Sequence, residues 1–466
     1  MKKTKIICSI GPVSNNREIM EEMVLKGMDC ARINMSHSNY EEIDSIIDVV
    51  REVRKSTNVP IAIMYDTKGP ELRTLAFEKD IEVKTNQMIK IVKDNVLGNL
   101  EKFSLNHEEV LNKLNIGNKV LIDDALIEFE VIEKEENEVL LKALNDGVLK
   151  SHKSVTIPGI DLGLEFISEE DKKDIEYAAT HSCDYLALSF VNRKEDVEEA
   201  RKIIESAGGD ARIIAKIESR LGVENIDEIM KAADGIMIAR GDLGVEVSME
   251  ELPFLQKQII TKCRENGKFA IVATEMLASM YENPRPTRAE VSDIANAVID
   301  GTDCVMLSGE TTIGKYPIHA VEIMANTCIE AEKEIDYTKH TAYKRTIGIS
   351  DTIARLAVDA VEYDNIKLIV APTMTGFSAR KISNLRPNCS IMACCPSSHI
   401  AEKVALNFGV KSVITEVFDN TDQMVEHLKE LSKKEFNLEE GDLILITGGF
   451  PPGRTRRTNY LRIVEI

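Results

Sequence analysis

The sequence predicts an α/β protein whose largest part is a closed (β/α)₈ barrel. Short apolar, β-rich runs alternate with amphipathic helical patterns along most of the chain, and this alternation is typical of a parallel sheet. Eight such strands precede residue 340, and eight repeats favour a barrel that carries its chemistry at the carboxyl ends of its strands. One interval lacks the repeat, and the pattern restarts after residue 340. We therefore also expect an inserted domain and a second, open α/β domain.

The predicted barrel strands are apolar runs, most of which end in polar residues. They cover residues 4–10, 29–35, 60–66, 184–190, 212–217, 235–239, 269–274 and 303–308. Most of the segments between them are predicted to be helices. KEDVEEARKIIESAG, for example, repeats apolar residues at i, i+3 and i+4 and places charges on the other face.

Residues 73–153 interrupt the strand–helix repeat. They contain short alternating strands with turn signals between them, such as NKVLID and LIEFEVIEKEENEVLLKAL, which predict a small all-β insertion. The insertion leaves the barrel after the third strand, where a lid would exclude water from the site. We therefore expect the barrel at 1–72 and 154–340, the lid at 73–153 and the C-terminal domain at 341–466.

The C-terminal part contains two groups of residues that suit an anion. Its strands KLIVAPT, SIMACCP, VKSVITEV and DLILITG alternate with helices, and NYLRIVEI follows as a last strand. Thr373, Thr375, Gly376 and Ser378 fall at a strand-to-helix turn, which suits either a phosphate or ordinary helix capping. Arg454, Arg456 and Arg457 follow in a late loop, where they suit an anion site, a solvated loop or a subunit contact.

The composition excludes several classes of partner. The chain has 466 residues and a formal net charge of -20, which opposes binding to nucleic acid or to an anionic membrane. No apolar run reaches the roughly 18 residues of a membrane span, and the N-terminal residues do not form a signal peptide. Nine cysteines occur without CxxC spacing, which is typical of reduced thiols. We expect a cytoplasmic protein.

Polar residues at the strand exits predict one active rim. Any one of them is explained by a cap or a turn, but the carboxyl ends of barrel strands converge, and so many polar exits favour a site. The exits carry Asn34, Ser36, His37, Asp66, Thr67, Ser189, Lys216, Glu218, Arg240, Asp242, Thr274, Glu275, Ser308 and Glu310.

These residues lie in segments that resemble the pyruvate kinase family over essentially the whole chain. The matching segments are KIICSIGP, ARINMSHS, DTKGPELRT, AKIES, ARGDLGVE, ATEMLASM, PRPTRAEVSDIANAVIDGTDCVMLSGE and PPGRTRRTN. The resemblance implies a (β/α)₈ barrel, a small β-barrel lid and a C-terminal α/β regulatory domain. It implies transfer of a phosphoryl group from phosphoenolpyruvate to ADP, giving ATP and pyruvate.

The resemblance also assigns roles at the rim. Glu218 and Asp242 would bind Mg²⁺ or Mn²⁺, and Arg32 and Lys216 would contact the phosphoryl group. The substrate carboxylate would lie on the N–H groups of Gly241 and Asp242, with Thr274 close to the carbon that is protonated.

Further roles follow from the same resemblance. The residues Asn34, Ser36, Asp66 and Thr67 would bind K⁺, and Glu71 is the residue type that accompanies potassium dependence in the family. Nucleotide phosphates would be contacted by Arg73, His37, Asn34 and Lys153. A sugar phosphate would bind the anion groups of the C-terminal domain, and family members are usually homotetramers.

Four positions depart from the family pattern. Glu275 stands in place of Gln, Leu75 and Ala125 stand in place of Gly, and Arg193 is displaced by one position.

Two other functions fit some of the residues. A barrel lyase or aldolase would use the same carboxylates, although it needs no nucleotide lid. A silent binding protein would have lost Lys216, Glu218, Asp242 or Thr274, all of which are present.

Overall fold

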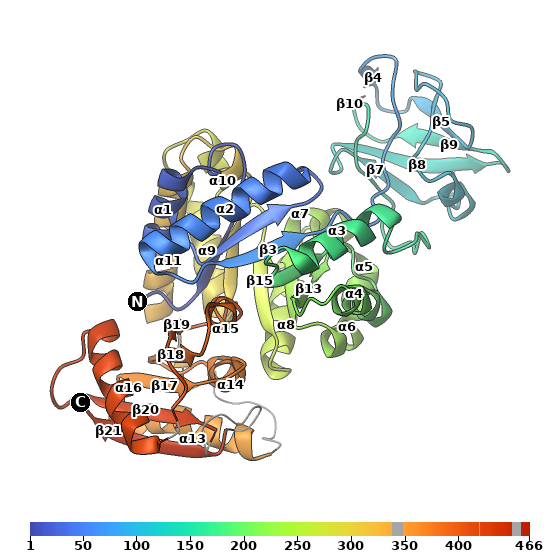
Figure 1. Cartoon of the computed structure of the whole chain (residues 1–466). Coiled ribbons are helices and arrows are strands. Elements are labelled where there is room, and N and C mark those ends of the chain that lie inside the picture. The colour runs from blue at the N-terminus through green and yellow to red at the C-terminus, as the bar shows by residue number, and fades with distance from the viewer. Residues whose placement is uncertain (338–347, 419, 450–457) are drawn as a thin grey trace.

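The predicted eight-stranded parallel barrel is confirmed. The computed structural model describes residues 1–337, 348–418, 420–449 and 458–466. The barrel closes in the order β1-β16-β15-β14-β13-β12-β3-β2 (Figure 1). Its strands are β1 (Lys5–Ser9), β2 (Cys30–Asn34), β3 (Ala62–Asp66), β12 (Tyr185–Leu188), β13 (Arg212–Ile217), β14 (Gly235–Ala239), β15 (Phe269–Ala273) and β16 (Cys304–Leu307).

Helices surround the barrel and bury their apolar faces against it. They are α1 (Arg17–Lys26), α2 (Tyr40–Thr57), α3 (Glu169–Thr180), α4 (Lys194–Ser206), α5 (Arg220–Glu224), α6 (Ile226–Ala232), α7 (Arg240–Glu246), α8 (Leu252–Glu265), α9 (Arg288–Asp300), α10 (Gly309–Thr312) and α11 (Pro317–Lys333). A short 3₁₀ turn, η2, covers Ala278–Tyr281. Asn39 with Glu42 and Thr287 with Glu290 form capping boxes that fix the starts of α2 and α9.

The inserted domain leaves the barrel after β3 and projects away from it (Figure 1). It contains a two-stranded sheet, β10-β4, and a six-stranded sheet, β11-β7-β8-β9-β5-β6. Its elements are β4 (Ile81–Val83), β5 (Met88–Val92), β6 (Lys102–Phe103), η1 (Glu108–Asn112), β7 (Lys119–Ile122), β8 (Ile127–Lys134), β9 (Glu138–Ala143), β10 (Gly147–Leu149) and β11 (Val155–Thr156). Arg73 and Ser154 pair where the two connecting strands meet the barrel, and the sheet continues past residue 153 to Thr156.

The C-terminal domain is an open α/β domain, as the sequence predicts. Its sheet has the order β19-β18-β17-β20-β21, with β21 antiparallel to β20. Its elements are α13 (Ile349–Asp364), β17 (Leu368–Pro372), α14 (Phe377–Asn384), β18 (Ser390–Cys395), α15 (Ser398–Glu402), β19 (Val410–Ile414), α16 (Thr421–Phe436), β20 (Leu443–Gly448) and β21 (Tyr460–Glu465). The domain lies at the end of the barrel away from the insertion (Figure 1).

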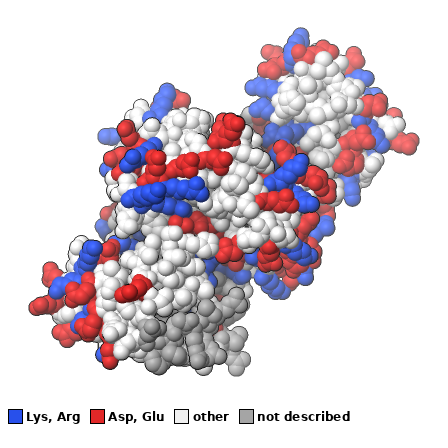
Figure 2. All heavy atoms as spheres, viewed as in Figure 1, with Lys and Arg blue, Asp and Glu red and all other residues white. Residues whose placement is uncertain are grey.

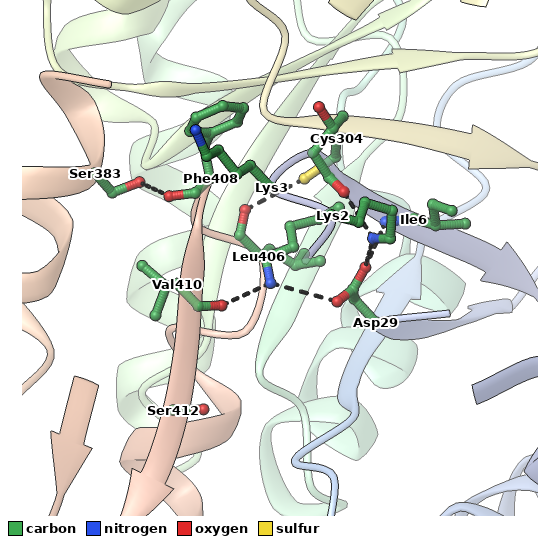
Figure 3. A network of polar contacts seen from close by, with 12 residues as sticks. Lys2, Lys3, Ile6, Asp29, Cys304, Ser383, Leu406, Phe408, Val410 and Ser412 are labelled. Atoms are coloured by element: carbon green, nitrogen blue, oxygen red, sulfur yellow. Dashed lines mark hydrogen bonds and ion pairs between the residues drawn. The ribbon is translucent and has the colours of Figure 1, made fainter. Parts of the chain in front are cut away.

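The C-terminal domain closes the amino end of the barrel. Ala405 and Leu406 pack in the same apolar cluster as the barrel interior, and Leu406 is fully buried. The Cys304 thiol donates to the Leu406 carbonyl at 3.4 Å (Figure 3). Lys5 Nζ donates to the Val410 carbonyl at 2.7 Å. The barrel interior is therefore completed by residues from the last domain.

An aspartate precedes every second barrel strand and ties that strand to the preceding one. The four are Asp29, Asp184, Asp234 and Asp303, and their carboxylates accept the backbone N–H groups of Ile6, Ile63, Ile213 and Ala270 at 2.8, 2.9, 3.0 and 2.8 Å, respectively. Each carboxylate also pairs with a basic side chain; the basic partners are Lys2, Arg54, Arg201 and Arg386. This repeat binds the strands together in pairs at the amino end, and Figure 3 shows the Asp29 member.

Charges of both signs cover the outside of the molecule. Figure 2 shows acidic and basic side chains interspersed over the barrel and the insertion. Among the residues that the structure describes, no helix is long and apolar enough to cross a membrane.

We expect Asp184 to make stability depend on pH near neutrality. Burial raises the pKa of Asp184 to about 7 despite the attraction of Arg54. Burial would also raise the pKa of Asp234, but Arg201 and the Ile213 N–H together hold it below its usual value. The folded-state pKa of Asp184 exceeds the unfolded value, so its contribution is complete below pH 3.8 and is lost as pH rises through about 7. Unfolding free energy should therefore fall by about 1 kcal/mol per pH unit approaching pH 7.

Denaturation curves across this pH range test the expectation. Asp184→Asn should reduce the slope by about 1 kcal/mol per pH unit, because the amide does not titrate; Glu218, whose pKa burial also raises to about 7, keeps its own contribution. Asp234→Asn is the matched control, since Asp234 makes the same kind of N–H contact one strand pair further along, and it should keep the slope. An unchanged slope in Asp184→Asn would contradict the assignment.

Candidate active site

A cavity opens between the carboxyl ends of the barrel strands and the inserted domain. Its volume is about 250 Å³, and part of its wall comes from residues 154–164, which lead back from the insertion to the barrel. Glu71, Asp124, Glu218 and Asp242 line it with carboxylates. The predicted rim therefore borders a space large enough for a small ligand.

A buried lysine lies at the centre of the rim. Lys216 Nζ lies 3.0 Å from Asp66 Oδ1 and 3.0 Å from Glu218 Oε1, and it donates to Ser189 Oγ at 2.6 Å. Burial alone would lower the pKa of Lys216, but Asp66 and Glu218 outweigh it and raise the pKa above its usual value. Lys216 is therefore a fixed positive charge at this rim.

Asp66 lies between two cations. Its Oδ2 accepts from Arg32 Nε at 2.7 Å while its Oδ1 faces Lys216, and Arg32 also donates to Ser9 Oγ at 2.6 Å. Burial would raise the pKa of Asp66, but Arg32 and Lys216 together hold it below its usual value. The Arg32 and Lys216 side chains thus converge on one carboxylate, which suits a site that receives an anion.

Glu218 and Asp242 form a second pair of acidic groups. Glu218 is almost fully buried on the exit of β13, and its Oε2 accepts from the Phe190 N–H at 2.7 Å. Burial raises the pKa of Glu218 to about 7 against the attraction of Lys216, and burial also raises the pKa of Asp242. Two neighbouring carboxylates in this setting leave negative charge that a cation would offset.

The acidic pair fits a hard divalent cation. Mg²⁺ prefers oxygen ligands and is usually held by one or two carboxylates, with waters and substrate oxygens in the remaining positions. Glu218 and Asp242 both line the cavity. No group of three or more His, Cys, Asp or Glu side chains suited to a metal occurs within residues 1–337, 348–418, 420–449 and 458–466, so an all-protein metal cage is not the type of site that they form.

The expected monovalent-cation residues come from two adjacent strand ends. Asn34 and Asp66 are paired in register on β2 and β3. Thr67 is buried and its Oγ1 accepts from the Ser189 N–H at 3.3 Å, whereas Ser36 is exposed. Asn34 Oδ1 accepts from the Ser36 N–H at 3.1 Å. The strand pairing and these contacts place the predicted oxygen donors at one edge of the rim.

A sharp corner follows β15. Thr274 and Glu275 have φ values of 68° and 55°, and a left-handed conformation is a genuine outlier for a β-branched residue. Thr274 Oγ1 donates to the Ala273 carbonyl at 2.7 Å and accepts from the Gly241 N–H at 2.8 Å. Of the two amides expected to hold a carboxylate, that of Gly241 is therefore already engaged by Thr274.

The predicted nucleotide contacts lie near the connection to the insertion. Arg73 pairs with Glu71 at 2.6 Å and donates to the His152 carbonyl at 2.8 Å, and Lys153 pairs with Asp123 at 2.8 Å. His37 is exposed beside Asn34, whose carbonyl accepts its N–H at 3.3 Å. Arg73 and Lys153 therefore hold carboxylates that phosphate groups would have to replace.

Part of the predicted effector group lies at one turn of the C-terminal domain. Gly376 caps α14 with φ 76°, and a Cβ there would lie 2.4 Å from Val404 Cγ1. The Ser378 and Thr458 hydroxyls are 2.7 Å apart, and Arg380 donates to the Thr375 carbonyl at 2.9 Å. Thr373 is buried at the end of β17. Arg454, Arg456 and Arg457 lie outside the described residues.

The departures from the family pattern have visible local consequences. Ala125 follows Asp123 and Asp124 in a turn where all three have positive φ, so the turn keeps a left-handed conformation without glycine. The Leu75 N–H donates to the Ser104 carbonyl at 2.9 Å within the insertion. Arg193 forms an ion pair with Asp161 in the segment that leads back from the insertion.

Sequence reasoning gave no role to several residues that shape the rim. The sequence marks Ser189 only as a strand exit, yet its hydroxyl contacts Lys216 and the Thr67 carbonyl. Phe190 carries no sequence signal of a role, although its N–H donates to Glu218. Asp293 on α9 pairs with Arg240 at 2.6 Å, and a polar residue on a helix carries no sequence signal for such a contact.

Comparisons with known proteins agree over the whole chain. The family model for the pyruvate kinase barrel domain matches residues 1–321, and the family model for the pyruvate kinase alpha/beta domain matches residues 351–464. A pyruvate kinase of Staphylococcus epidermidis is 42% identical, and one of Staphylococcus aureus is 41% identical; each match covers 99% of this chain and 80% of the relative. A solved pyruvate kinase structure from Cryptosporidium parvum is 38% identical with a TM-score of 0.95, covering 100% of this chain and 96% of that one.

We expect Mg²⁺ to stabilise the protein through the acidic pair. A ligand that binds only the folded state at 100 times its Kd adds about 2.7 kcal/mol of unfolding free energy. Saturating Mg²⁺ should therefore raise the melting temperature, and Glu218→Gln should abolish the rise. The measurement is thermal unfolding with and without the metal.

Glu246→Gln is the matched control for this experiment. Glu246 lines the same cavity and accepts the Gly159 N–H at 3.3 Å, away from the pair. It should keep the wild-type response to Mg²⁺. A rise that persists in Glu218→Gln would place the metal elsewhere.

Proposed function

The chain belongs to the pyruvate kinase family, and we propose that it transfers the phosphoryl group of phosphoenolpyruvate to ADP, giving ATP and pyruvate. The observation that carries the proposal is the buried Lys216 near the end of β13, whose ammonium group lies 3.0 Å from both Asp66 and Glu218. Arg32 reaches the same Asp66 carboxylate. A fixed cluster of this kind neutralises charge on a phosphoryl group as it moves.

Lys216 and Arg32 bind the transferring group in this proposal. Both side chains are anchored by Asp66, so their charges are in place before the substrate arrives. Such preorganised donors stabilise a transition state without reorganising during the reaction. Ser189 helps to fix the lysine, because its hydroxyl lies 2.6 Å from Lys216 Nζ.

Two kinds of cation complete the proposed site. Glu218 and Asp242 would hold Mg²⁺ or Mn²⁺, which when bound neutralises negative charge on the substrate oxygens. Asn34, Ser36, Asp66 and Thr67 would hold K⁺ through oxygen donors. Family members with a lysine at the position of Glu71 use its charge in place of K⁺. Glu71 supplies no such charge, which supports a requirement for K⁺ in this chain.

Proton transfer to enolpyruvate is assigned to the Thr274 corner. The Thr274 hydroxyl accepts the Gly241 N–H, and Gly241 and Asp242 lie in the first turn of α7, where N–H groups favour a carboxylate. The carboxylate of the substrate would bind these amides and replace Thr274 at the Gly241 N–H, and Thr274 would relay a proton through water to the methylene carbon.

Nucleotide phosphates would bind the side of the site that faces the insertion. Arg73 and Lys153 lie on the two connecting strands and now hold Glu71 and Asp123. His37 and Asn34 lie on the barrel side. Closure of the insertion would bring these cations onto ADP and exclude water.

We expect pyruvate formation from phosphoenolpyruvate and ADP to require Mg²⁺ and K⁺. Lys216→Met should lower the rate by about 10²–10³-fold or more, since one charge that stabilises the transition state is lost. The measurement is steady-state pyruvate production with K⁺, with Na⁺ and without monovalent salt. Equal rates in all three salts would contradict the potassium assignment.

Lys5→Met is the matched control. Lys5 is also buried and pairs with Asp29, but it lies at the amino end of the barrel, where it begins β1. In the variant, Lys2 would still pair with Asp29, from which it lies 2.6 Å away. Lys5→Met should keep most of the activity. Absence of pyruvate from the wild-type chain under every salt would instead favour a barrel lyase or a silent relative.

Regulation and assembly form the remaining part of the proposal. A sugar phosphate would bind Thr373, Thr375, Gly376 and Ser378 together with Arg454, Arg456 and Arg457, and the chain would act as a cytoplasmic homotetramer. All nine cysteines are free and buried, which supports a reducing compartment. The Gly376 turn contacts Val404, which lies two residues before Leu406 in the barrel floor.

We expect a phosphorylated sugar to lower the half-saturating concentration of phosphoenolpyruvate. Coupling between two ligand sites is typically 1–3 kcal/mol, or about 5–150-fold in affinity. Thr375→Val should weaken the effect by removing one hydroxyl, whereas Thr415→Val, on the far edge of the same domain, should not. The proposal would be contradicted if the half-saturating concentration stayed the same with fructose bisphosphate and with a sugar monophosphate.

A further inference from the structure

The corner after β15 is held in a conformation that its residues do not favour. Thr274 and Glu275 both have left-handed backbones, although neither is glycine. Strained residues of this kind persist only where surrounding contacts fix them, and they gather at functional sites. The contacts that fix Thr274 therefore bear on the reaction.

Arg240 is the residue that fixes the backbone of this corner. Its side chain is only 9% exposed; Nη2 donates to the Thr274 carbonyl at 2.7 Å, and Nη1 pairs with Asp293 Oδ2 at 2.6 Å. The next residue, Gly241, donates its N–H to the Thr274 hydroxyl. Residues 240 and 241 thus hold both polar ends of Thr274, the carbonyl and the hydroxyl.

The geometry requires a guanidinium group. Arg240 reaches a carbonyl and a carboxylate at once through two separate nitrogens, which suits the planar fork of arginine better than the single ammonium of lysine. Its third nitrogen, Nε, is buried and has no hydrogen-bond partner among the described residues. An unsatisfied buried donor opposes stability, so packing alone does not explain an arginine here.

We propose that Arg240, anchored by Asp293, is a positioning residue that holds Thr274 with its hydroxyl directed at the site of proton transfer. The inference rests on the proposed function, in which enolpyruvate gains a proton at its methylene carbon while its oxygen becomes the ketone. Arg240 touches neither substrate nor metal in this account. It acts through the backbone of Thr274.

The proposal predicts a loss of proton transfer with little loss of stability in Arg240→Met. Methionine fills a similar volume without an unsatisfied donor, and Asp293 is 35% exposed, so water can solvate its charge. Displacing a reacting group by about 1 Å can cost 10²-fold. We expect kcat to fall by about 10²-fold, with a much smaller change in KM for phosphoenolpyruvate.

Deuterium exchange separates positioning from a merely structural role. Pyruvate in deuterium oxide, with Mg²⁺, K⁺ and inorganic phosphate, should gain deuterium in its methyl group by reversal of the proposed proton step. Proton NMR should show this exchange falling in parallel with kcat in Arg240→Met. Arg240→Lys should fall less, because one of the two contacts can still form.

Arg201→Met is the matched control. Arg201 also donates to a backbone carbonyl, that of Ala232 at 2.9 Å, and pairs with an aspartate, Asp234 at 3.0 Å, but at the amino end of the barrel. It should lower the melting temperature without changing exchange. Asp293→Asn offers a second test should Arg240→Met fail to fold, and we expect it to lower exchange by about tenfold.

The outcomes distinguish this inference from the proposed function. A wild-type chain that makes no pyruvate overturns the proposed function. An active wild type, with exchange and kcat within twofold in folded Arg240→Met or in Asp293→Asn, overturns the positioning role. Equal losses in Arg201→Met and Arg240→Met would also overturn it, since the effect would then follow stability.

Discussion

The ion pairs of Lys216 with Asp66 and Glu218 are the interaction around which the rim is organised. A buried ammonium group is costly unless carboxylates compensate it, and these partners come from different barrel strands. The barrel must therefore close with β3 and β13 in fixed positions, or the charges are left unpaired. The same requirement places Arg32, which shares Asp66, on the rim, and Asp242 lines the cavity together with Glu218.

Charged residues lie at both ends of the barrel, but they make different kinds of contact at each end. At the carboxyl end, Glu218 and Asp242 line a cavity, and Lys216 and Arg32 pair with Asp66 on the same rim. At the amino end, Asp29, Asp184, Asp234 and Asp303 each bind a neighbouring strand and a basic side chain, and none of them lines the rim. Charge at one end serves chemistry, whereas charge at the other serves the register of the strands.

The sequence predicted the architecture and the rim because both follow from local patterns. The strand–helix repeat predicts eight strands, and the polar residues at their exits include Lys216, Glu218 and Asp242. The contacts between elements did not follow from these patterns. The sequence marks Arg240 as a strand exit, but its contacts with Thr274 and Asp293 depend on where α9 and the corner after β15 lie relative to it. The four aspartates at the amino end do leave a pattern in the sequence, because one of them directly precedes every second barrel strand. That pattern becomes recognisable only when the pairing of the strands is known.

Closure of the barrel floor by Leu406 has a consequence for the synthesis of the chain. All eight barrel strands emerge from the ribosome before the residue that fills the base of their shared interior. Domains generally fold from the N-terminus as they are made, yet here the first domain waits for the last to complete its core. The nascent barrel therefore exposes an apolar opening until the C-terminal domain has been made. A chain that stops before the C-terminal domain would keep that opening and expose it to chaperones and proteases.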